Sequence, residues 1–222
     1  MAHFALTWFY LANDSSGAST KCDSRSTNRI QKKLSQTVAA LAAEFPDQEV
    51  ELWSADEARL GLQPVLRRIW AKRAERRNAL VEPRYEWLWV YAAVHPRTGQ
   101  VFWLILPRLN GDCVQLFVDE FARTHLSEGK RIVLVWDGAP AHRAKKLRIP
   151  AAITLVNFPA YTPELNPSER LWSPLKETIA NERQADIEQL EEKVIKRCQT
   201  IGSNTEAVKS MTNYHWWAAL EP

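Results

Sequence analysis

The sequence has few cysteines and no long hydrophobic run. Only three cysteines, Cys22, Cys113 and Cys198, occur in 222 residues. Their wide separation excludes a zinc-binding spacing or a close redox pair, and their odd number argues against the disulfide framework of a secreted protein. No hydrophobic run approaches the roughly 20 residues of a membrane-spanning helix. The apolar stretch 4–12 lacks the basic residue that precedes the core of a signal peptide. We therefore expect an intracellular protein without a membrane partner.

Neither sign of charge dominates the chain, whose net charge is only +3. The basic residues are nevertheless clustered: segment 59–77 holds seven bases and one acid, and segment 143–148 holds four bases and no acid. A solvated surface is the usual explanation of one such cluster, but these two each follow an aspartate, Asp56 or Asp137. Clusters of basic residues that follow a possible catalytic aspartate are typical of contact with a nucleic-acid backbone. The sequence therefore predicts phosphate contacts by Arg67, Arg68, Lys145 and Lys146.

The spacing of apolar residues predicts five strands and five helices. Residues 1–28 are rich in small polar residues and are expected to be a poorly ordered extension. Residues 29–45 form an amphipathic helix, and 46–222 form one folded domain. Strands are expected at 49–55, 86–95, 100–106, 131–136 and 153–158, and further helices at 113–126, 141–147, 166–179 and 186–201. The order predicts an α/β protein with a mixed five-stranded sheet and helices on both faces, which is the ribonuclease-H-like architecture.

Three carboxylates stand at matched places along this pattern. Asp56 and Asp137 each follow an apolar run and are expected at strand ends, while Glu169 opens a helix. Acids at one edge of an α/β sheet lie where such proteins place their site. Carboxylate oxygens are the ligands that Mg²⁺ and Mn²⁺ prefer, and two such ions about 4 Å apart can clamp the attacking and leaving oxygens of a phosphodiester. The pattern predicts metal-dependent chemistry on a polynucleotide, with these three residues as ligands.

Each of these residues, and their neighbours, also has a simpler interpretation. Asp137 could cap the following turn. Asn166-Pro-Ser-Glu169 is a good capping box, in which a glutamate is expected even in an inert helix. Glu164 is a rival ligand, and Glu57 either faces away or binds water of the outer shell. His142 either orients a water or a phosphate, or is a packed, hydrogen-bonded neighbour.

Four segments together resemble one known family. They are 56–61 (Asp-Glu-Ala-Arg-Leu-Gly), 68–70 (Arg-Ile-Trp), 135–142 (Val-Trp-Asp-Gly-Ala-Pro-Ala-His) and 159–172 (Pro-Ala-Tyr-Thr-Pro-Glu-Leu-Asn-Pro-Ser-Glu-Arg-Leu-Trp). They resemble the catalytic domain of bacterial insertion-sequence transposases of the IS six-thirty type, allied to the Tc/mariner superfamily. The resemblance runs from about Ile30 to Tyr214, and its most specific part is Tyr-x-Pro-Glu-Leu-Asn-Pro-x-Glu.

The resemblance implies a ribonuclease-H-like fold and a DDE triad of Asp56, Asp137 and Glu169. It implies Mg²⁺ or Mn²⁺, with two ions, and DNA cleavage at an element end followed by strand transfer into target DNA. It also implies a homodimer when active and a cytoplasmic, nucleoid-associated location in a bacterium. Such transposases carry N-terminal helix-turn-helix modules, which residues 1–28 do not resemble. We therefore expect a truncated copy, or the downstream half of a split gene with an upstream helix-turn-helix polypeptide as partner.

Two other functions share parts of this pattern. A ribonuclease-H-like nuclease would cleave DNA without strand transfer. An inactive or repurposed DNA-binding remnant would bind DNA without cleaving it. The intact acids favour an enzyme, whereas the missing reader module favours the remnant.

Overall fold

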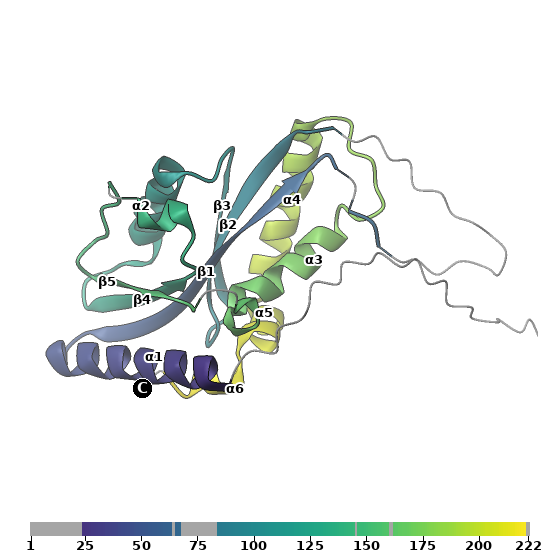
Figure 1. Ribbon diagram of the computed structural model, residues 1–222. Helices are drawn as coiled ribbons and strands as arrows, with labels where there is room; N and C mark the ends of the chain where they lie inside the picture. The colour runs from purple at the N-terminus through teal and green to yellow at the C-terminus, as the bar shows by residue number, and fades with distance from the viewer. Residues whose placement is uncertain (1–23, 64, 68–83, 145, 160–161, 221–222) are drawn as a thin grey trace, which may run out of the picture.

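A five-stranded sheet forms the centre of the molecule (Figure 1). The computed structural model describes residues 24–63, 65–67, 84–144, 146–159 and 162–220. The strands are β1 (Glu49–Gly61), β2 (Trp87–His95), β3 (Gln100–Leu106), β4 (Lys130–Trp136) and β5 (Ile153–Asn157), in the order β3-β2-β1-β4-β5. β2 runs antiparallel to both of its neighbours, β1 and β3, whereas β4 is parallel to β1 and β5 is parallel to β4. This is the mixed sheet that the sequence predicted.

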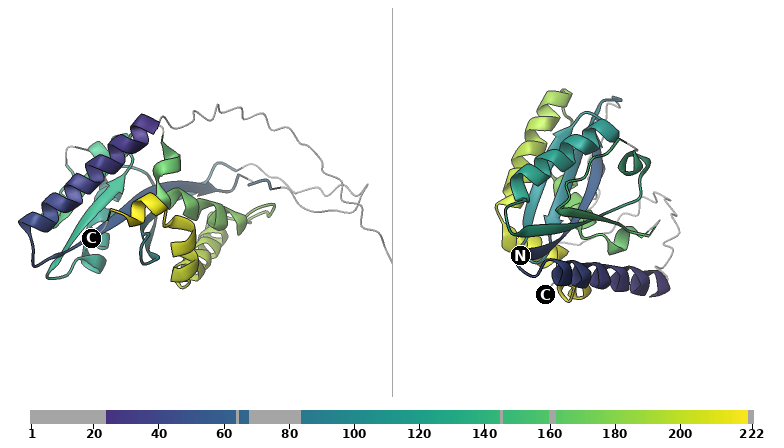
Figure 2. Two further views of the ribbon diagram at one scale, coloured as in Figure 1. Left: turned by 90° about the horizontal axis from the view of Figure 1, so that it is seen from below. Right: turned by 90° about the vertical axis from the view of Figure 1, so that its left-hand side faces the viewer.

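Helices pack on both faces of the sheet. The α-helices are α1 (Ser24–Glu44), α2 (Gly111–His125), α3 (Trp172–Glu177), α4 (Ile187–Gly202), α5 (Thr205–Thr212) and α6 (His215–Ala218). Three short 3₁₀ helices are η1 (Pro140–Arg143), η2 (Pro163–Leu165) and η3 (Pro167–Leu171). Figure 2 shows α1 and α2 on opposite sides of β4 and β5. None of the helices in the described ranges is long and apolar enough to cross a bilayer.

The alternation of side chains along β1 defines the two faces. Ala58 and Leu60 pack against η3, α3 and α4, and Val50 and Leu52 pack against α1. We call this the Asp56 face, because Asp56 lies an even number of residues from these four and so has its side chain on the same side of the strand. Trp53 and Ala55 pack against α2 on the other side, which we call the Glu57 face. Neighbouring residues of β1 therefore serve opposite sides of the sheet.

The strand β1 is longer than its sequence indicates. Its parallel pairing with β4 ends at Ser54 opposite Val135, but its antiparallel pairing with β2 continues from Ser54 to Gly61. Asp56 therefore lies inside a strand, and its expected place at a strand end is wrong. Asp137 does follow the last residue of β4, as predicted. The polar residues after Ala55 hid the continuation, although every second residue there remains apolar.

Several other boundaries differ from the predictions. The expected helix 166–179 is divided into η3 and α3, and the expected helix 141–147 is only the 3₁₀ turn η1. α1 begins at Ser24, so the predicted border at residue 28 falls inside a helix. Residues 1–23 lie outside the described part of the chain, and the division into an extension and a catalytic domain stays a prediction.

Candidate active site

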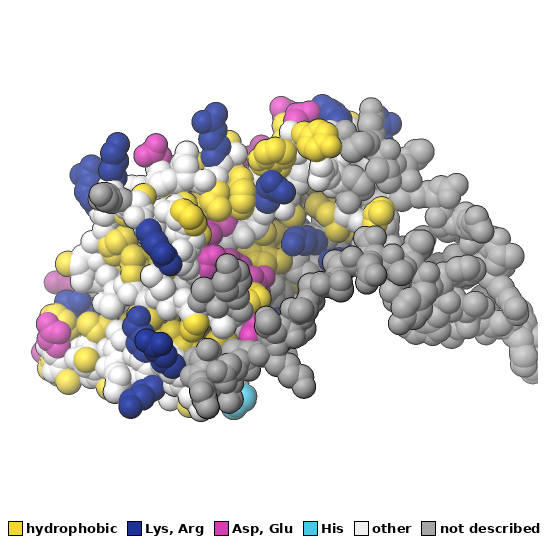
Figure 3. Space-filling view, in the orientation of Figure 1, with side chains coloured by type: hydrophobic (Ala, Val, Ile, Leu, Met, Phe, Trp, Pro, Cys, Tyr) yellow, Lys and Arg dark blue, Asp and Glu magenta, His cyan; other side chains and the backbone are white. Residues whose placement is uncertain are grey.

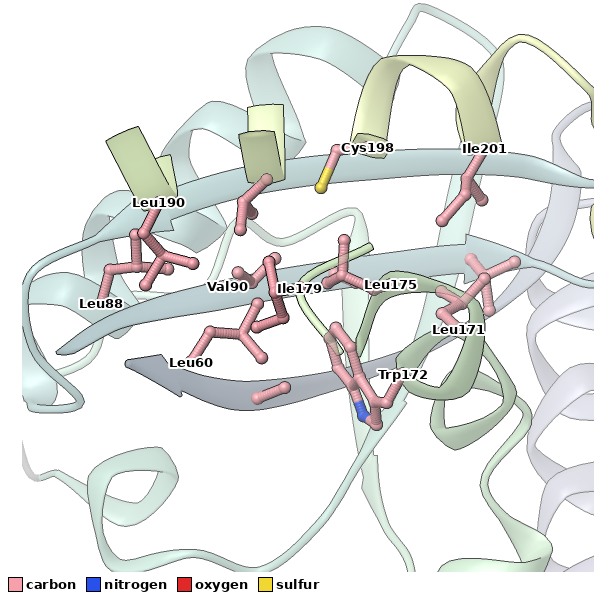
Figure 4. Close-up of a cluster of buried hydrophobic side chains, with 14 of the residues drawn as sticks. Leu60, Leu88, Val90, Leu171, Trp172, Leu175, Ile179, Leu190, Cys198 and Ile201 are labelled. Carbon is pink, nitrogen blue, oxygen red and sulfur yellow. The ribbon is translucent and has the colours of Figure 1, made fainter. Parts of the chain in front are cut away.

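Asp56 is a buried carboxylate held by a tryptophan. Its exposed fraction is only 8%, and its Oδ2 accepts a hydrogen bond of 2.7 Å from the Trp172 indole nitrogen. Trp172 itself is buried in the cluster that Leu171 and Leu175 form against β2 (Figure 4). The rigid indole therefore fixes the orientation of the carboxylate. Trp172 lies three residues after Glu169 in sequence, yet the ligand candidate that it holds is Asp56.

A buried hydrogen-bond network fixes η3, which carries Glu169, against β1. The hydroxyl of Ser168 donates to the Ser54 carbonyl at 2.7 Å, and the Ser54 hydroxyl donates to the Asn166 amide oxygen at 2.5 Å. The Asn166 amide nitrogen reaches the Ala55 carbonyl at 3.4 Å. The groups of β1 in this network belong to Ser54 and Ala55, which lie two residues and one residue before Asp56. The network therefore sets the position of η3 relative to Asp56.

The capping-box interpretation of Glu169 fits the structure only in part. The Asn166 side chain does cap, because its oxygen accepts a hydrogen bond from the Ser168 backbone N–H at 3.0 Å. The reciprocal bond would run from the Asn166 N–H to Glu169. That N–H donates instead to the Pro163 carbonyl at 3.0 Å. The Glu169 carboxylate is therefore not occupied in the second half of a capping box.

Asp137, directly after β4, is hydrogen bonded to His142 of η1. His142 Nδ1 lies 2.8 Å from Asp137 Oδ1, and the Ala139 backbone N–H donates to the same oxygen at 2.9 Å. The other ring nitrogen of His142 lies 2.9 Å from Glu57 Oε1. The side chains of His142 and Glu57 are 1% and 4% exposed, whereas that of Asp137 is 53% exposed. Oδ1 of this half-exposed carboxylate is thus held by the buried His142 ring and by the Ala139 backbone.

The carboxylates influence one another electrostatically. Burial raises the pKa of Asp56 well above its usual value, and the nearby charges of Glu169 and Glu57 raise it further, against the opposing hydrogen bond from Trp172. Burial also raises the pKa of Glu169. The charge of Asp137 adds to that rise, while Lys176 and a hydrogen bond with Asp56 oppose it. Acids from β1, the end of β4 and η3 therefore share one electrostatic environment. The positive charge near them is too small to offset their burial and mutual repulsion, so the pKa values of Asp56 and Glu169 stay raised.

Asp137 and His142 form a well-compensated pair. The hydrogen bond from His142 lowers the pKa of Asp137, in spite of the partial burial of the carboxylate. Burial would lower the pKa of His142, but its bonds with Asp137 and Glu57 raise it to about 10. At neutral pH the imidazole therefore carries a proton on both ring nitrogens.

One group of side chains in the described ranges has its ligand atoms close enough for a metal ion. It consists of Glu57, Asp137 and His142, whose ligand atoms lie within 4.8 Å of one another. A metal needs an unprotonated ring nitrogen, but both nitrogens of His142 donate to carboxylates. We therefore interpret this group as a support for Asp137. The carboxylate oxygens of Asp56, Asp137 and Glu169 are not all within 4.8 Å of one another, although Asp56 and Glu169 are hydrogen bonded, and their role as metal ligands stays a prediction.

Residues 51–191 match the family model described as DDE superfamily endonuclease. The match covers more than half of the chain and includes Asp56, Asp137 and Glu169. The chain belongs to this superfamily. An uncharacterised protein of Sinorhizobium fredii (strain NBRC 101917 / NGR234), y4pE/y4sA, is 34% identical over 97 residues, which cover 44% of this chain and 71% of that protein. The predicted resemblance is confirmed at the level of the superfamily, and the IS six-thirty type stays a prediction.

Solved structures of the mariner transposase Mos1 share the fold of this DDE endonuclease. The chain in the pre-cleavage Mos1 transpososome superposes with a TM-score of 0.57 at 13% identity, covering 90% of this chain and 64% of that one. The Mos1 catalytic domain gives 0.52 at 12% identity, covering 89% of this chain and 95% of that domain. The likeness confirms the predicted ribonuclease-H-like fold. This chain spans less than two thirds of the longer Mos1 protein.

The candidate phosphate contacts of this DDE endonuclease are only partly described. Arg67 is exposed and pairs with Glu177 at 3.0 Å, and Lys146 is exposed. Arg68 and Lys145 lie outside the described residues. Figure 3 shows acidic side chains near the middle of one face, with separate basic side chains around them. His142 was also a candidate DNA contact, but its burial and its two carboxylate partners place it beneath the surface.

Sequence reasoning missed two features of the DDE site. The bond between Glu57 and His142 joins residues 85 positions apart, and no local pattern predicts it. Lys176 lies one turn after Trp172, near enough to Glu169 to affect its pKa. The two-residue alternation of β1 could have shown that Glu57 turns away from Asp56, which was one of its two interpretations.

Proposed function

We propose that this chain is the catalytic domain of a DDE transposase, which cleaves DNA at the ends of a mobile element and joins the freed ends to target DNA. The observation that carries this proposal is the buried Asp56 carboxylate, placed beside Glu169 and lacking a compensating cation. A buried acid whose pKa is strongly raised by burial and by a neighbouring like charge is a candidate functional residue. Membership of the DDE superfamily makes a divalent metal the natural partner of this acid.

The residues present fit a divalent ion. Asp56, Asp137 and Glu169 offer oxygen ligands only, and one oxygen of Asp137 faces outward. We propose that they hold Mg²⁺ or Mn²⁺, with two ions in the active complex. When bound, these ions would supply Lewis-acid stabilisation to the phosphodiester under attack.

The surrounding side chains have distinct tasks in this proposal. Trp172 holds Oδ2 of Asp56, and Asn166 and Ser168 set the height of Glu169 above β1. Preorganised ligands of this kind reduce the reorganisation that the reaction requires. The exposed bases Arg67 and Lys146 would position the DNA backbone without reading its sequence.

The DNA partner and the assembly follow from the same proposal. Two of the Mos1 structures that share this fold are described as paired-end and strand-transfer complexes, which supports DNA ends and target DNA as ligands here. We propose a homodimer as the active form and a separate helix-turn-helix polypeptide as the reader of the element ends. The location would be the bacterial cytoplasm, on the nucleoid.

A DNA cleavage assay tests this function. Labelled duplexes carrying the inverted repeats that flank the gene are incubated with the protein and Mg²⁺, Mn²⁺ or a chelator. We expect metal-dependent cleavage, and joined products when target DNA is added. Asp56→Asn, Asp137→Asn and Glu169→Gln should each abolish both. Glu164→Gln tests the rival ligand: Glu164 is exposed in η2 and has no place in the proposed triad, so this variant should keep both activities.

The products separate the rival functions. Cleavage without joined products would indicate a nuclease. DNA binding with no cleavage in either metal would indicate a repurposed remnant and would refute the proposal. Cleavage that persists in Glu169→Gln would remove this residue from the triad.

A further inference from the structure

His142 lies close to the point where the backbone pairing between β1 and β4 ends. The last β1–β4 pair is Ser54 with Val135, two residues before Asp56 and Asp137. No ladder therefore fixes the two aspartates relative to each other. Side chains must supply this connection if the two carboxylates are to act together.

A three-residue bridge spans this gap. Glu57 Oε1, on β1, accepts a hydrogen bond of 2.9 Å from His142 Nε2, and His142 Nδ1 donates to Asp137 Oδ1 at 2.8 Å. Nδ1 also lies 3.0 Å from the Asp137 carbonyl. The bridge therefore holds both the backbone and the side chain of Asp137.

The bridge is rigid because His142 at its centre is buried and stacked on a tryptophan. The imidazole of His142 stacks on Trp136 with ring centroids 4.4 Å apart and an angle of 7°. Trp136 in turn donates from its indole nitrogen to Asn157 of β5 at 3.0 Å. The orientation of His142 is thus set by β4 and β5, and Glu57 sets its distance from β1.

The two oxygens of the Asp137 carboxylate differ in their hydrogen bonds. Both hydrogen bonds that the described residues make to it reach Oδ1, from His142 and from the Ala139 N–H. Oδ2 has no protein donor among these residues. A carboxylate fixed through one oxygen presents the other in a defined direction, which is what a metal ligand requires.

We propose that Glu57 and His142 are positioning residues that fix Asp137 relative to Asp56 from the opposite face of the sheet. This inference rests on the proposed function, because it takes Asp137 as a metal ligand. Residues that hydrogen-bond a ligand typically contribute about 10–100-fold to metal affinity or activity. Neither residue touches DNA or metal in this proposal.

The chain contains a matched control for this bridge. Glu51 lies six residues before Glu57 on the same strand and face, and it accepts hydrogen bonds from Lys130 at 2.6 Å and Trp53 at 2.8 Å. The His125 ring packs against Trp53 at a tilt of 54°, with ring centroids 4.5 Å apart. This second glutamate–histidine–tryptophan group lies at the far end of β1 and has no contact with the candidate site. Substitutions there reproduce the loss of packing without the loss of the bridge.

The test measures Mn²⁺ binding by electron paramagnetic resonance, with the full chain and no DNA. We expect the Mn²⁺ Kd of His142→Asn and Glu57→Ala to rise by about tenfold or more. Glu57→Gln retains an oxygen acceptor for His142 and should recover most of the affinity. His125→Asn and Glu51→Gln should change the Kd by less than about twofold. Single-turnover cleavage should fall by about 10–100-fold in the first two variants, with the KM for DNA unchanged.

The outcomes separate this inference from the proposed function. Wild-type Mn²⁺ affinity in folded His142→Asn and Glu57→Ala would overturn the positioning role. If His142→Asn does not fold, the comparison of Glu57→Ala with Glu57→Gln decides in its place. If the wild-type protein binds Mn²⁺ and cleaves no DNA, transposition is refuted, but the affinity difference still upholds the bridge. A wild-type protein that binds no Mn²⁺ refutes the metal site and the inference together.

Discussion

Replacing Asp56 by asparagine should stabilise the metal-free protein, although it should abolish activity. The wild-type carboxyl is buried, and Glu169 repels its charge. Asparagine has nearly the same shape, and its amide oxygen can still accept the hydrogen bond from Trp172. The variant therefore removes a buried charge and keeps the one contact that orients the side chain.

The size of this effect follows from the environment of the group. Single stabilising substitutions commonly contribute about 0.5–2 kcal/mol, and active sites are often destabilised for function, so we expect about 1–2 kcal/mol for this variant. For a chain of this length that corresponds to a melting temperature higher by about 2–8 °C. Saturation with Mn²⁺ at about 100 times its Kd should stabilise the wild type by about 2.7 kcal/mol, and the variant hardly at all. The wild type then becomes the more stable protein by about 1 kcal/mol.

The pH dependence has a definite sign. The pKa of Asp56 is raised in the folded protein, so below about pH 4 the carboxyl is neutral in both the folded and the unfolded states. As the pH rises, the unfolded chain releases its proton first, and the wild type loses stability until the folded pKa is passed. The advantage of Asp56→Asn should therefore be absent near pH 4 and should grow toward neutral pH.

Thermal unfolding at several pH values, with and without Mn²⁺, measures these differences. Glu164→Gln is the control, because it removes an exposed carboxylate from η2 and should shift no midpoint. The reasoning is refuted if Asp56→Asn is less stable than the wild type at pH 7 without metal. A variant that gains as much stability from Mn²⁺ as the wild type would show that Asp56 is not a ligand.

Three further predictions concern the neighbouring groups. Glu169→Gln should abolish cleavage and change the free energy of unfolding by less than about 0.5 kcal/mol; because Gln also fits the third position of a capping box, retained cleavage would restore the cap interpretation. Ser168→Ala should cost about 1–2 kcal/mol in chemical denaturation and slow cleavage, since it frees η3 from Ser54, whereas the exposed Ser203→Ala should do neither. Replacing Lys145 and Lys146 by alanine should lower DNA affinity equally for all sequences and flatten the salt slope by roughly one to two units in fluorescence anisotropy; a loss confined to one sequence would mean that these lysines read bases.

The sequence by itself determined the fold class and the superfamily, and it predicted which three acids form the site. The pattern of apolar residues predicted β3 with its observed bounds and β2, β4 and β5 to within one residue of theirs. Local rules suffice here, because a strand buried on both sides must be apolar throughout and must end where polar residues and turns begin. The specific stretch around Glu169, together with the runs before Asp56 and Asp137, was enough to indicate the DDE superfamily.

Only the tertiary structure decided how these acids are held. The continuation of β1 past Asp56 depends on pairing with β2, which no local pattern specifies. The roles of Trp172, Ser168 and Glu57 each depend on a partner far away in sequence, at separations of 116, 114 and 85 residues. A sequence shows which side chains can ligate a metal, but their orientation arises from long-range contacts, and these exist only once the sheet and its two layers of helices have formed.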